Sequence, residues 1–364
     1  MPEIHAARRE RLRAAVAALD ADAALITSLV NVRYLTGLVS SNAALLLPAG
    51  GPDVLATDSR YALAAARDCP DLELAIARFF EPVLASLAAE RGLRRVAFEA
   101  HEVTVERYEV LAGLDAGLGL VSLGRAVEKL RMVKDEQEIA LLARACEITS
   151  RAFEDTLPRI RPGMTERELA KLMERAIIDG GADKPAFDTI VASGPNGALP
   201  HHVPGERALT SGDMITIDGG ARYAGYHADM TRTVVLGEPA DWQRDVYALV
   251  AAAQQAGIRA AVPGTDLLAV DGVARDVIDQ AGHREHFTHG LGHGVGLEIY
   301  EAPILGYGRT GTLADRVPIT VEPGVYLPGV GGVRIEDTLV VRAGAGTAVP
   351  PELLTTTTRE LLAL

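Results

Sequence analysis

The sequence predicts an α+β protein with two domains. Its 364 residues exceed what one ordinary hydrophobic core holds. Segments with helical periodicity alternate with short apolar segments typical of strands, and the second part of the chain repeats a pattern of its own. With 48% hydrophobic and 23% charged residues, the composition is that of a globular protein.

The first domain is expected to span residues 1–124. Residues 5–19 carry Leu12, Val16 and Leu19 on one face of a helix. The turn residues Pro48–Pro52 separate two apolar runs, which predicts a β-hairpin. Short apolar runs predict four strands in all, at residues 23–27, 43–47, 54–57 and 95–98.

The second domain, residues 125–364, contains an internal repeat. Its first half opens a helix with Thr165 and Glu168, which are spaced as a capping box. Three features then recur in the same order, which indicates two duplicated helix-and-strand units related by a pseudo-twofold axis. The recurring pairs are Pro162-Gly163 and Pro263-Gly264, Ile215–Gly220 and Ile319–Gly324, and Asp229 and Glu336.

Four acids of this repeat are expected to converge on one small region. Asp218 ends an apolar strand, and Asp229 lies on the strand predicted to return from it, at residues 226–236. The two carboxylates should therefore face each other across a hairpin. Glu322 and Glu336 occupy matching positions in the second repeat.

Such a group of carboxylates predicts a divalent-metal site. Buried acids without a counter-charge must bind protons or cations, and Arg232 and Arg334 alone cannot neutralise four of them. One such acid taken alone is readily explained as a surface residue at a hairpin end. Four acids in two matching hairpins are not, because each hairpin places its pair in the same way.

A glycine-rich segment, Thr288–Gly296, is expected to supply an imidazole. Its alternate glycines let the backbone come close to a ligand, and they argue against a helical zinc motif. Of His289 and His293, one is expected to bind metal and the other to line the pocket. Carboxylates with one imidazole suit Mn²⁺, Co²⁺ or Zn²⁺.

Together these motifs resemble the signature of the pita-bread metallopeptidases. Within that family the chain is most similar to the cytoplasmic Xaa-Pro peptidases of bacteria, the prolidase and aminopeptidase P branch. The resemblance covers nearly the whole chain and implies a creatinase/prolidase-like first domain before the pita-bread catalytic domain. The matching runs are Asn31–Gly37, Thr57–Tyr61, Leu130–Asp135, Ile217–Gly220, Ala228–Thr233, His289–Leu297, Val321–Gly324 and Arg334–Asp337.

The resemblance implies two divalent ions per chain, most simply Mn²⁺, with Co²⁺ or Zn²⁺ as alternatives. One ion would be held by Asp218, Asp229 and Glu336. Asp229 and Glu336 would bridge to the second ion, which His293 and Glu322 complete. The implied activity is cleavage of the Xaa-Pro bond at the N-terminus of dipeptides or short peptides.

The resemblance also implies roles in catalysis. Glu322 would act as general base toward a water that the two ions acidify, and His201 would stabilise the tetrahedral intermediate. His289 and Arg334 are expected to contact the substrate, His289 in the pocket that receives proline, with a purely structural role as the alternative for His289. Neighbouring His202 is expected to face solvent, and Thr231 and Thr233 to donate hydrogen bonds to the carboxylates.

Two positions depart from the family pattern. Tyr300 stands where a histidine is usual; its phenol can donate a hydrogen bond but is not cationic at neutral pH, so an altered rate or pH profile is expected. Ile304 stands where some prolidases have an arginine that binds the free carboxylate of a dipeptide. Strict dipeptide specificity is therefore not expected, unless Arg60 or an arginine of a neighbouring subunit replaces it.

Other functions are less consistent with the sequence. A weak or inactive peptidase-like binding module and a non-peptidase creatinase-like hydrolase are the alternatives, and the complete set of five ligands argues against both. A net charge of −13 without a basic run disfavours nucleic acid, and no apolar run is long enough for a membrane helix.

Cellular location and assembly are expected to follow the family. No secretory signal is recognised, and Cys69 and Cys146 lie in apolar stretches, which predicts buried free thiols in a reducing compartment. The protein is therefore expected in the cytoplasm. Relatives are often dimers, so a homodimer acting on short proline-containing peptides is expected.

Overall fold

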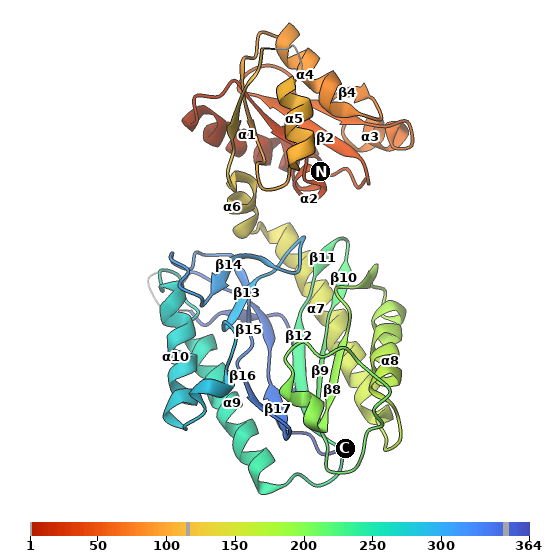
Figure 1. The fold of residues 1–364 in the computed structure, drawn as a ribbon, viewed down its shortest axis with the longest axis vertical. Helices are drawn as coiled ribbons and strands as arrows, with labels where there is room; N and C mark the ends of the chain where they lie inside the picture. The colour runs from red at the N-terminus through yellow and green to blue at the C-terminus, as the bar shows by residue number, and fades with distance from the viewer. Residues whose placement is uncertain (1, 114–116, 345–348) are drawn as a thin grey trace. The chain divides into compact units, whose positions relative to one another are not determined.

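The computed structural model describes residues 2–113, 117–344 and 349–364, and it divides into two compact units (Figure 1). Unit 1 is Met1–Arg131 and unit 2 is Met132–Leu364. Unit 1 extends past the expected boundary at residue 124 because Arg131 donates a buried hydrogen bond to Asn31, at 2.8 Å. In the described ranges, no helix is both long enough and apolar enough to cross a membrane.

Unit 1 is built on a six-stranded mixed sheet in the order β4-β3-β2-β1-β5-β6. The predicted hairpin is confirmed, since β2 and β3 pair antiparallel with Ala43 opposite Thr57. Leu46 and Phe80 belong to its buried core. The elements are α1 (Pro2–Ala18), β1 (Ala23–Ile26), α2 (Leu29–Thr36), β2 (Ala43–Pro48), β3 (Val54–Thr57), α3 (Ala62–Asp68), β4 (Glu73–Ile76), α4 (Phe80–Glu90), β5 (Arg95–Phe98), α5 (Val105–Gly113), β6 (Gly119–Ser122) and α6 (Ala126–Met132).

Unit 2 contains the same arrangement of elements twice. Its first half consists of α7 (Glu136–Thr156), α8 (Glu166–Asp179), β7 (Lys184–Pro185), β8 (Ile190–Ser193), β9 (Met214–Gly219), β10 (Ala221–Tyr223), β11 (Tyr226–His227) and β12 (Met230–Val235). Its second half consists of α9 (Asp241–Ala260), α10 (Leu267–Gln280), β13 (Gly292–Gly294), β14 (Glu301–Leu305), β15 (Pro318–Val321), β16 (Gly324–Leu327), β17 (Gly331–Arg334), β18 (Asp337–Val340) and β19 (Glu352–Leu353). Short 3₁₀ helices lie at Leu157–Arg159, Gly194–Ala198 and Arg284–His286.

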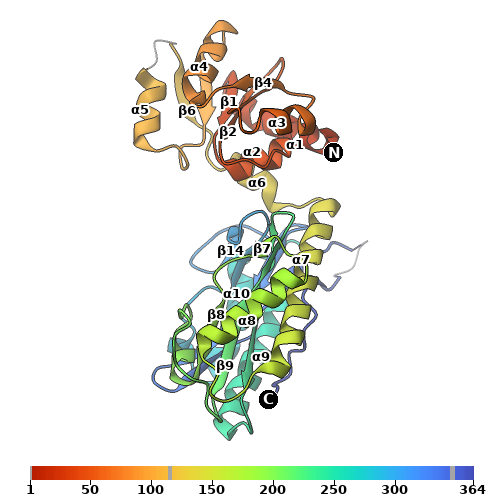
Figure 2. The same ribbon diagram turned by 90° about the vertical axis from the view of Figure 1, so that its right-hand side faces the viewer.

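In each half, two helices precede three antiparallel strands. The strand order is β12-β9-β8 in the first half, and β18-β15-β13 occupies the matching positions in the second. Helices α7 and α8 lie on one side of the strands and α9 and α10 on the other, as the two views show (Figures 1 and 2). Each pair has its own buried core, with Phe153 and Met173 in one and Val250 and Ile278 in the other.

The echoed Pro-Gly pairs make equivalent turns. Gly163 and Gly264 adopt φ values of 85° and 86°, which favour glycine. The N–H of Gly163 donates to the carbonyl of Leu209, and that of Gly264 to the carbonyl of Leu313, both at 2.8 Å. Each turn leads into a capped helix, and the predicted capping box at Thr165 is confirmed. The duplication is therefore present at the level of individual hydrogen bonds.

The prediction of one continuous strand over residues 226–236 is wrong in one respect, because the structure has two shorter strands there, β11 and β12. Strand β11 pairs with β10, and β12 pairs with β9, so the chain leaves one ladder and enters another at Asp229. The crossing is tight: a Cβ on Gly220 would lie 1.8 Å from the carbonyl oxygen of Ala228. As a result Asp218 lies opposite Thr231 in the register, and Asp229 projects from the gap between two strands.

A buried ion pair anchors the segment that follows β13. Nζ of Lys134 lies 2.7 Å from Oε2 of Glu301, and the two side chains are 1% and 5% exposed. The other carboxylate oxygen of Glu301 accepts a hydrogen bond from the N–H of Glu298. The pair thus ties the start of unit 2 to the segment that contains Tyr300.

We expect Lys134→Met to destabilise unit 2 by about 3–5 kcal/mol, because it removes the buried ammonium group that bonds the Glu301 carboxylate. Urea unfolding followed by tryptophan fluorescence measures this directly, since the chain has a single tryptophan and Trp242 lies in α9. Lys129→Met, at an exposed position, is the matched control and should change stability by less than about 0.5 kcal/mol. Equal urea midpoints for the two variants would contradict the anchoring role.

Candidate metal centre

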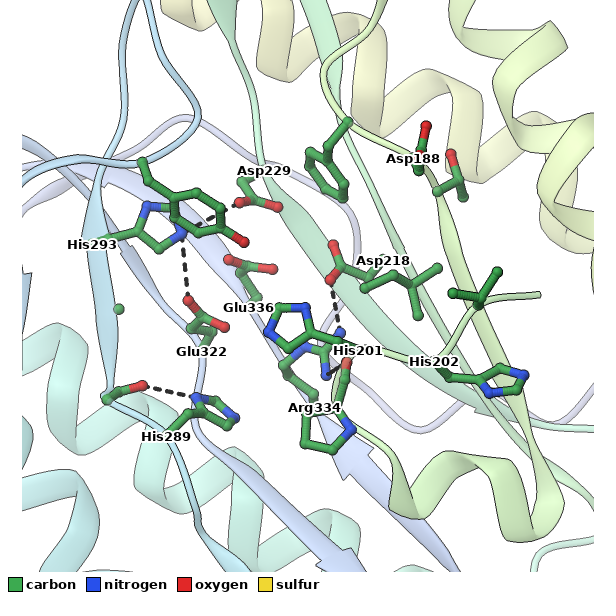
Figure 3. Close-up of a pocket in the computed structure, with 18 of the residues that line it drawn as sticks. Asp188, His201, His202, Asp218, Asp229, His289, His293, Glu322, Arg334 and Glu336 are labelled. Carbon is green, nitrogen blue, oxygen red and sulfur yellow. Dashed lines mark hydrogen bonds and ion pairs between the residues drawn. The ribbon is translucent and has the colours of Figure 1, made fainter. Parts of the chain in front are cut away.

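Five side chains meet in one pocket of unit 2 (Figure 3). The pocket has a volume of about 440 Å³, and every predicted metal ligand lines it. The first repeat contributes two ligands and the second contributes three, so both halves are needed to build the site. The ligands are Asp218 in β9, Asp229 before β12, His293 in β13, Glu322 after β15 and Glu336 before β18.

The backbone orients His293. Its Nδ1 donates to the carbonyl of Gly294 at 2.9 Å, which leaves Nε2 facing the acids. Nε2 lies 3.5 Å from Oδ2 of Asp229 and 3.6 Å from Oε1 of Glu322. One imidazole nitrogen is thus held by the protein, and the other is directed at two carboxylates.

The glycines around His293 serve a different purpose from the one expected. A Cβ on Gly292 would lie 2.1 Å from the carbonyl oxygen of Thr320, and one on Gly294 would lie 2.3 Å from that of Ala302. These glycines therefore let the neighbouring strands approach β13, rather than letting β13 approach a ligand. The result is still a histidine fixed on a close-packed strand.

The donor set fits divalent cations. Oδ1 of Asp218, Oδ1 of Asp229 and Oε1 of Glu336 are buried, and none has a hydrogen-bond partner within the described residues. Buried oxygens without donors are destabilising, and a cation removes that penalty. Asp229, His293 and Glu336 each offer one atom, and these atoms lie within 4.8 Å of one another. Carboxylates with one imidazole suit Mn²⁺, Co²⁺ or Zn²⁺.

Without a cation, the cluster holds protons. Burial raises the pKa of Asp218 to about 7, although the charge of Arg334 opposes the shift. Burial likewise raises the pKa of Glu322 to about 7, and burial together with the charge of Asp229 raises the pKa of Glu336 well above its ordinary value. For His293, burial lowers the pKa, but the hydrogen bond to Asp229 and the charge of Glu322 outweigh it and raise the pKa to about 9.

Arg334 orients two of the acids. It is 3% exposed, and its Nη2 donates to Oδ2 of Asp218 at 2.7 Å. Its Nε donates to the hydroxyl of Thr231, which in turn donates to Oε2 of Glu336 at 2.7 Å. Nη1 donates to the hydroxyl of Tyr326 and to the carbonyl of Pro200. Direct contact of Arg334 with substrate stays a prediction, since all these donors already face the protein.

Tyr326 is a residue that the sequence reasoning missed. Its hydroxyl accepts from Arg334 and donates to Nε2 of His289 at 2.8 Å, while Nδ1 of His289 donates to the carbonyl of Gly290. Burial and the charge of Arg334 lower the pKa of His289 to about 4, so this ring is neutral. The only sequence signal was a tyrosine in an apolar strand beside a ligand motif, where a buried hydroxyl needs a partner.

Tyr300 and Ile304 border the same pocket. The ring of Tyr300 packs edge-on against that of His293, with centroids 4.5 Å apart, and the residue is 62% exposed. Burial of its hydroxyl, together with the charge of Asp229, raises the pKa of Tyr300, so the phenol stays protonated. Ile304 lies opposite His293 in the ladder between β13 and β14.

Some polar neighbours differ from expectation. His202 does not face solvent; it is half-buried, and its Nε2 lies 2.8 Å from Oε2 of Glu166. Thr231 bonds a carboxylate as expected, but Thr233 donates to the carbonyl of Arg334 instead. Both differences arise from contacts between segments far apart in the sequence, 36 positions for His202 and 101 for Thr233, which the local sequence does not specify. His201 lines the pocket and is exposed.

Two family models match the chain. Residues 140–343 match the model of metallopeptidase family M24, and residues 8–133 match that of the creatinase/prolidase N-terminal domain. Among curated proteins, the chain is similar to the uncharacterized peptidase YqhT of Bacillus subtilis, with 36% identity over 95% of this chain and 99% of the relative.

Solved structures of similar proteins share the fold along nearly their whole length. A Xaa-Pro dipeptidase from Bacillus anthracis superposes with a TM-score of 0.94 at 35% identity, covering 99% of this chain and 100% of that one. An X-Pro aminopeptidase from Thermotoga maritima superposes with a TM-score of 0.89 at 36% identity, covering 98% of this chain and 99% of that one.

We expect the metal-free protein to lose stability as the pH rises from about 5 to 8. The folded-state pKa values of Asp218 and Glu322, about 7, exceed their ordinary values of 3.8 and 4.5, so between these limits the folded chain binds more protons than the unfolded chain. The raised pKa of His293, about 9, extends the same trend above pH 6.5. Thermal unfolding in the presence of a chelator should show the melting temperature, Tm, falling by roughly 5 °C or more.

The matched control is the double variant Asp218→Asn, Glu322→Gln, in which two of the raised carboxyl groups are replaced by amides. Its metal-free Tm should vary less with pH over the same range. Saturating Mn²⁺ should reverse the trend in the unmodified chain, since cations displace the protons more easily at higher pH. A metal-free Tm that rises between pH 5 and 8 would contradict the burial of this cluster.

Proposed function

The chain belongs to metallopeptidase family M24 and has the pita-bread fold, and on that premise we propose that it is a metal-dependent exopeptidase that removes an N-terminal residue preceding proline. This proposal rests on the convergence of five ligand side chains from two repeats, three of which have a buried oxygen without a hydrogen-bond partner in the described part of the chain. Relatives that are Xaa-Pro peptidases by name support the substrate class.

The metal ligands are assigned as the resemblance implies. Asp218, Asp229 and Glu336 would hold one ion, and His293 and Glu322 would complete a second that shares Asp229 and Glu336. We propose Mn²⁺ for both positions, with Co²⁺ or Zn²⁺ as alternatives, because carboxylates outnumber the imidazole. When bound, the ions supply Lewis-acid activation of water and of the peptide carbonyl.

Glu322 is proposed as the general base. Its side chain is 18% exposed, more than that of the neighbouring Asp229 at 7%, so it reaches the open part of the pocket. There its carboxylate can take a proton from the attacking water and pass it to the leaving proline nitrogen. Arg334 and Thr231 hold the other acids in place meanwhile, so the base need not reorganise the site.

Three side chains are proposed to contact the substrate. His201 and Tyr300 line the pocket and can each donate a hydrogen bond. During the reaction negative charge develops on the carbonyl oxygen of the substrate, which these donors would stabilise. His289 is neutral and packs between Phe287 and Tyr326, with ring centroids at 5.1 and 5.5 Å. Of these three rings only that of His289 lines the pocket, and we propose that it contacts the ring of proline.

The pocket lining favours peptides longer than dipeptides. Among the described lining residues the only guanidinium is that of Arg334, and its donors are directed at the protein. Ile304 offers no charge for a free carboxylate. Arg60 of unit 1 donates with Nε and Nη2 to Asp58. We therefore propose that the enzyme accepts short peptides and does not require a dipeptide.

A cytoplasmic homodimer is part of the same proposal. Cys69 and Cys146 are confirmed as buried free cysteines, which supports a reducing compartment. The dimer rests on the resemblance to the family.

We expect the Mn²⁺-loaded chain to cleave Ala-Pro-Ala at least as efficiently as Ala-Pro, and Ala-Ala negligibly. Glu322→Gln should lower kcat by about 10²–10⁴-fold because it removes the base while keeping the shape of the side chain. Ninhydrin or chromatographic release assays measure all of these rates. Absence of proline-dependent cleavage with Mn²⁺, Co²⁺ and Zn²⁺ alike would disprove the proposed activity.

Tyr300 should control the pH profile. Tyr300→Phe removes the phenolic donor and should lower kcat by about 10-fold, the effect of one hydrogen bond made in the transition state. Tyr300→His supplies a group that titrates near neutrality and should add a limb to the profile of kcat against pH between about 6 and 7. If both variants keep the kcat and pH profile of the parent, position 300 has no catalytic role.

A further inference from the structure

We propose that Glu166 and His202 form a positioning pair that holds the His201 imidazole toward the reacting carbonyl, a role that rests on the proposed function of His201. Neither residue lies among the metal ligands or in direct contact with them in the described contacts. Both act on the loop between Ser193 and Gly205, which carries His201 into the pocket.

One buried carboxylate, that of Glu166, holds this loop in place through hydrogen bonds. Glu166 is the first residue of α8 and is fully buried. Each of its oxygens accepts hydrogen bonds from the loop, and the donors come from both ends of it. Oε1 accepts from Ser193 N (2.9 Å), Ser193 Oγ (2.7 Å) and Asn196 Nδ2 (2.9 Å), and Oε2 accepts from His202 Nε2 (2.8 Å) and Gly205 N (3.2 Å).

Glu166 is charged in this position. Burial opposes ionisation, but the hydrogen bonds from Asn196, Ser193 and His202 outweigh it and hold the pKa of Glu166 below its usual value. Its place in the first turn of α8 adds the favourable end of the helix dipole. A charged acceptor with several donors gives stronger and more directional bonds than a neutral one.

His201, by contrast, has no anchor of its own. Within residues 2–113, 117–344 and 349–364, its imidazole makes no hydrogen bond or ion pair, and the residue is exposed. Its direction therefore depends on the backbone at either side. On one side the carbonyl of Pro200 accepts from Nη1 of Arg334 at 3.2 Å, and on the other His202 is bonded to Glu166.

The two adjacent imidazoles point in opposite directions. Figure 3 shows His201 directed toward Arg334 and the acids, and His202 directed away from them. Fixing the ring of His202 on Glu166 consequently fixes the face of the chain from which His201 projects. A donor held in this way needs less reorganisation when negative charge develops on the substrate, which lowers the barrier.

The test is a double-mutant cycle on the metal-loaded enzyme. His202→Ala should lower kcat for Ala-Pro-Ala by about 10–100-fold with KM changed less than threefold, the loss expected from a misplaced catalytic donor. In the His201→Ala background the same change should lower kcat no further, since the residue it positions is gone. His202→Gln restores an N–H donor to Glu166 and should recover kcat to within about threefold of the parent.

A merely structural role would give different results. Glu168→Ala is the matched control, because Glu168 is exposed in the same helical turn and bonds only Thr165 in the described contacts. It should lower Tm without changing kcat. In metal-free His202→Ala, the NMR chemical shifts of the His201 ring should move toward those of a free histidine side chain, which reports the loss of its fixed direction independently of activity.

The outcomes separate the two proposals. Suppose that His201→Ala lowers kcat and that the double variant shows the product of the two single reductions in kcat. The positioning role is then overturned, while the catalytic role of His201 stands. If His201→Ala leaves kcat unchanged, the catalytic role itself is overturned, and the positioning role with it. Failure of His202→Gln to recover kcat, at a Tm equal to that of the parent, also overturns the positioning role.

Discussion

Four carboxylates buried in one pocket are the constraint on which the rest of the structure depends. Their mutual repulsion and the loss of hydration would unfold the site unless protons or cations compensate. The compensation within the protein is partial, since Arg334 neutralises one charge, protonated His293 offsets a second, and Thr231 satisfies one oxygen. Three buried oxygens keep no hydrogen-bond partner among the described residues, so the pocket is suited to bind cations.

The duplicated fold provides the rigidity that this arrangement requires. Each repeat packs its helix pair on its own core, and hydrogen bonds between the repeats then hold the acids, since Arg334 bonds Asp218 and Thr231 bonds Glu336. Tight backbone contacts then leave the ligand side chains little freedom to move. The chain passes close to Gly220 where Asp229 joins two ladders, and β13 packs close against β15 at Gly292. Two of the ligands lie on strands and three lie directly beside strand ends, whereas the substrate-facing His201 lies on a loop that needs separate anchors.

Much of this could be predicted from the sequence, because local signals repeat along the chain. The capping box at Thr165, the echoed Pro-Gly turns and the order of the acids each have a short-range cause. The interruption at Asp229 could not be predicted, since it depends on the approach of Gly220 to a distant carbonyl. The partnership of His202 with Glu166 spans 36 positions and likewise has no local signal.

We propose that this pocket holds two divalent cations. Calorimetric titration of Mn²⁺ into the chelator-treated chain, repeated in buffers of different ionisation enthalpy, tests it most directly. We predict two ions per chain at pH 7 with net release of protons, because the pKa values of Asp218, Glu322 and His293 leave protons on the empty cluster. Binding of less than one ion per chain, or binding without proton release, would contradict the account.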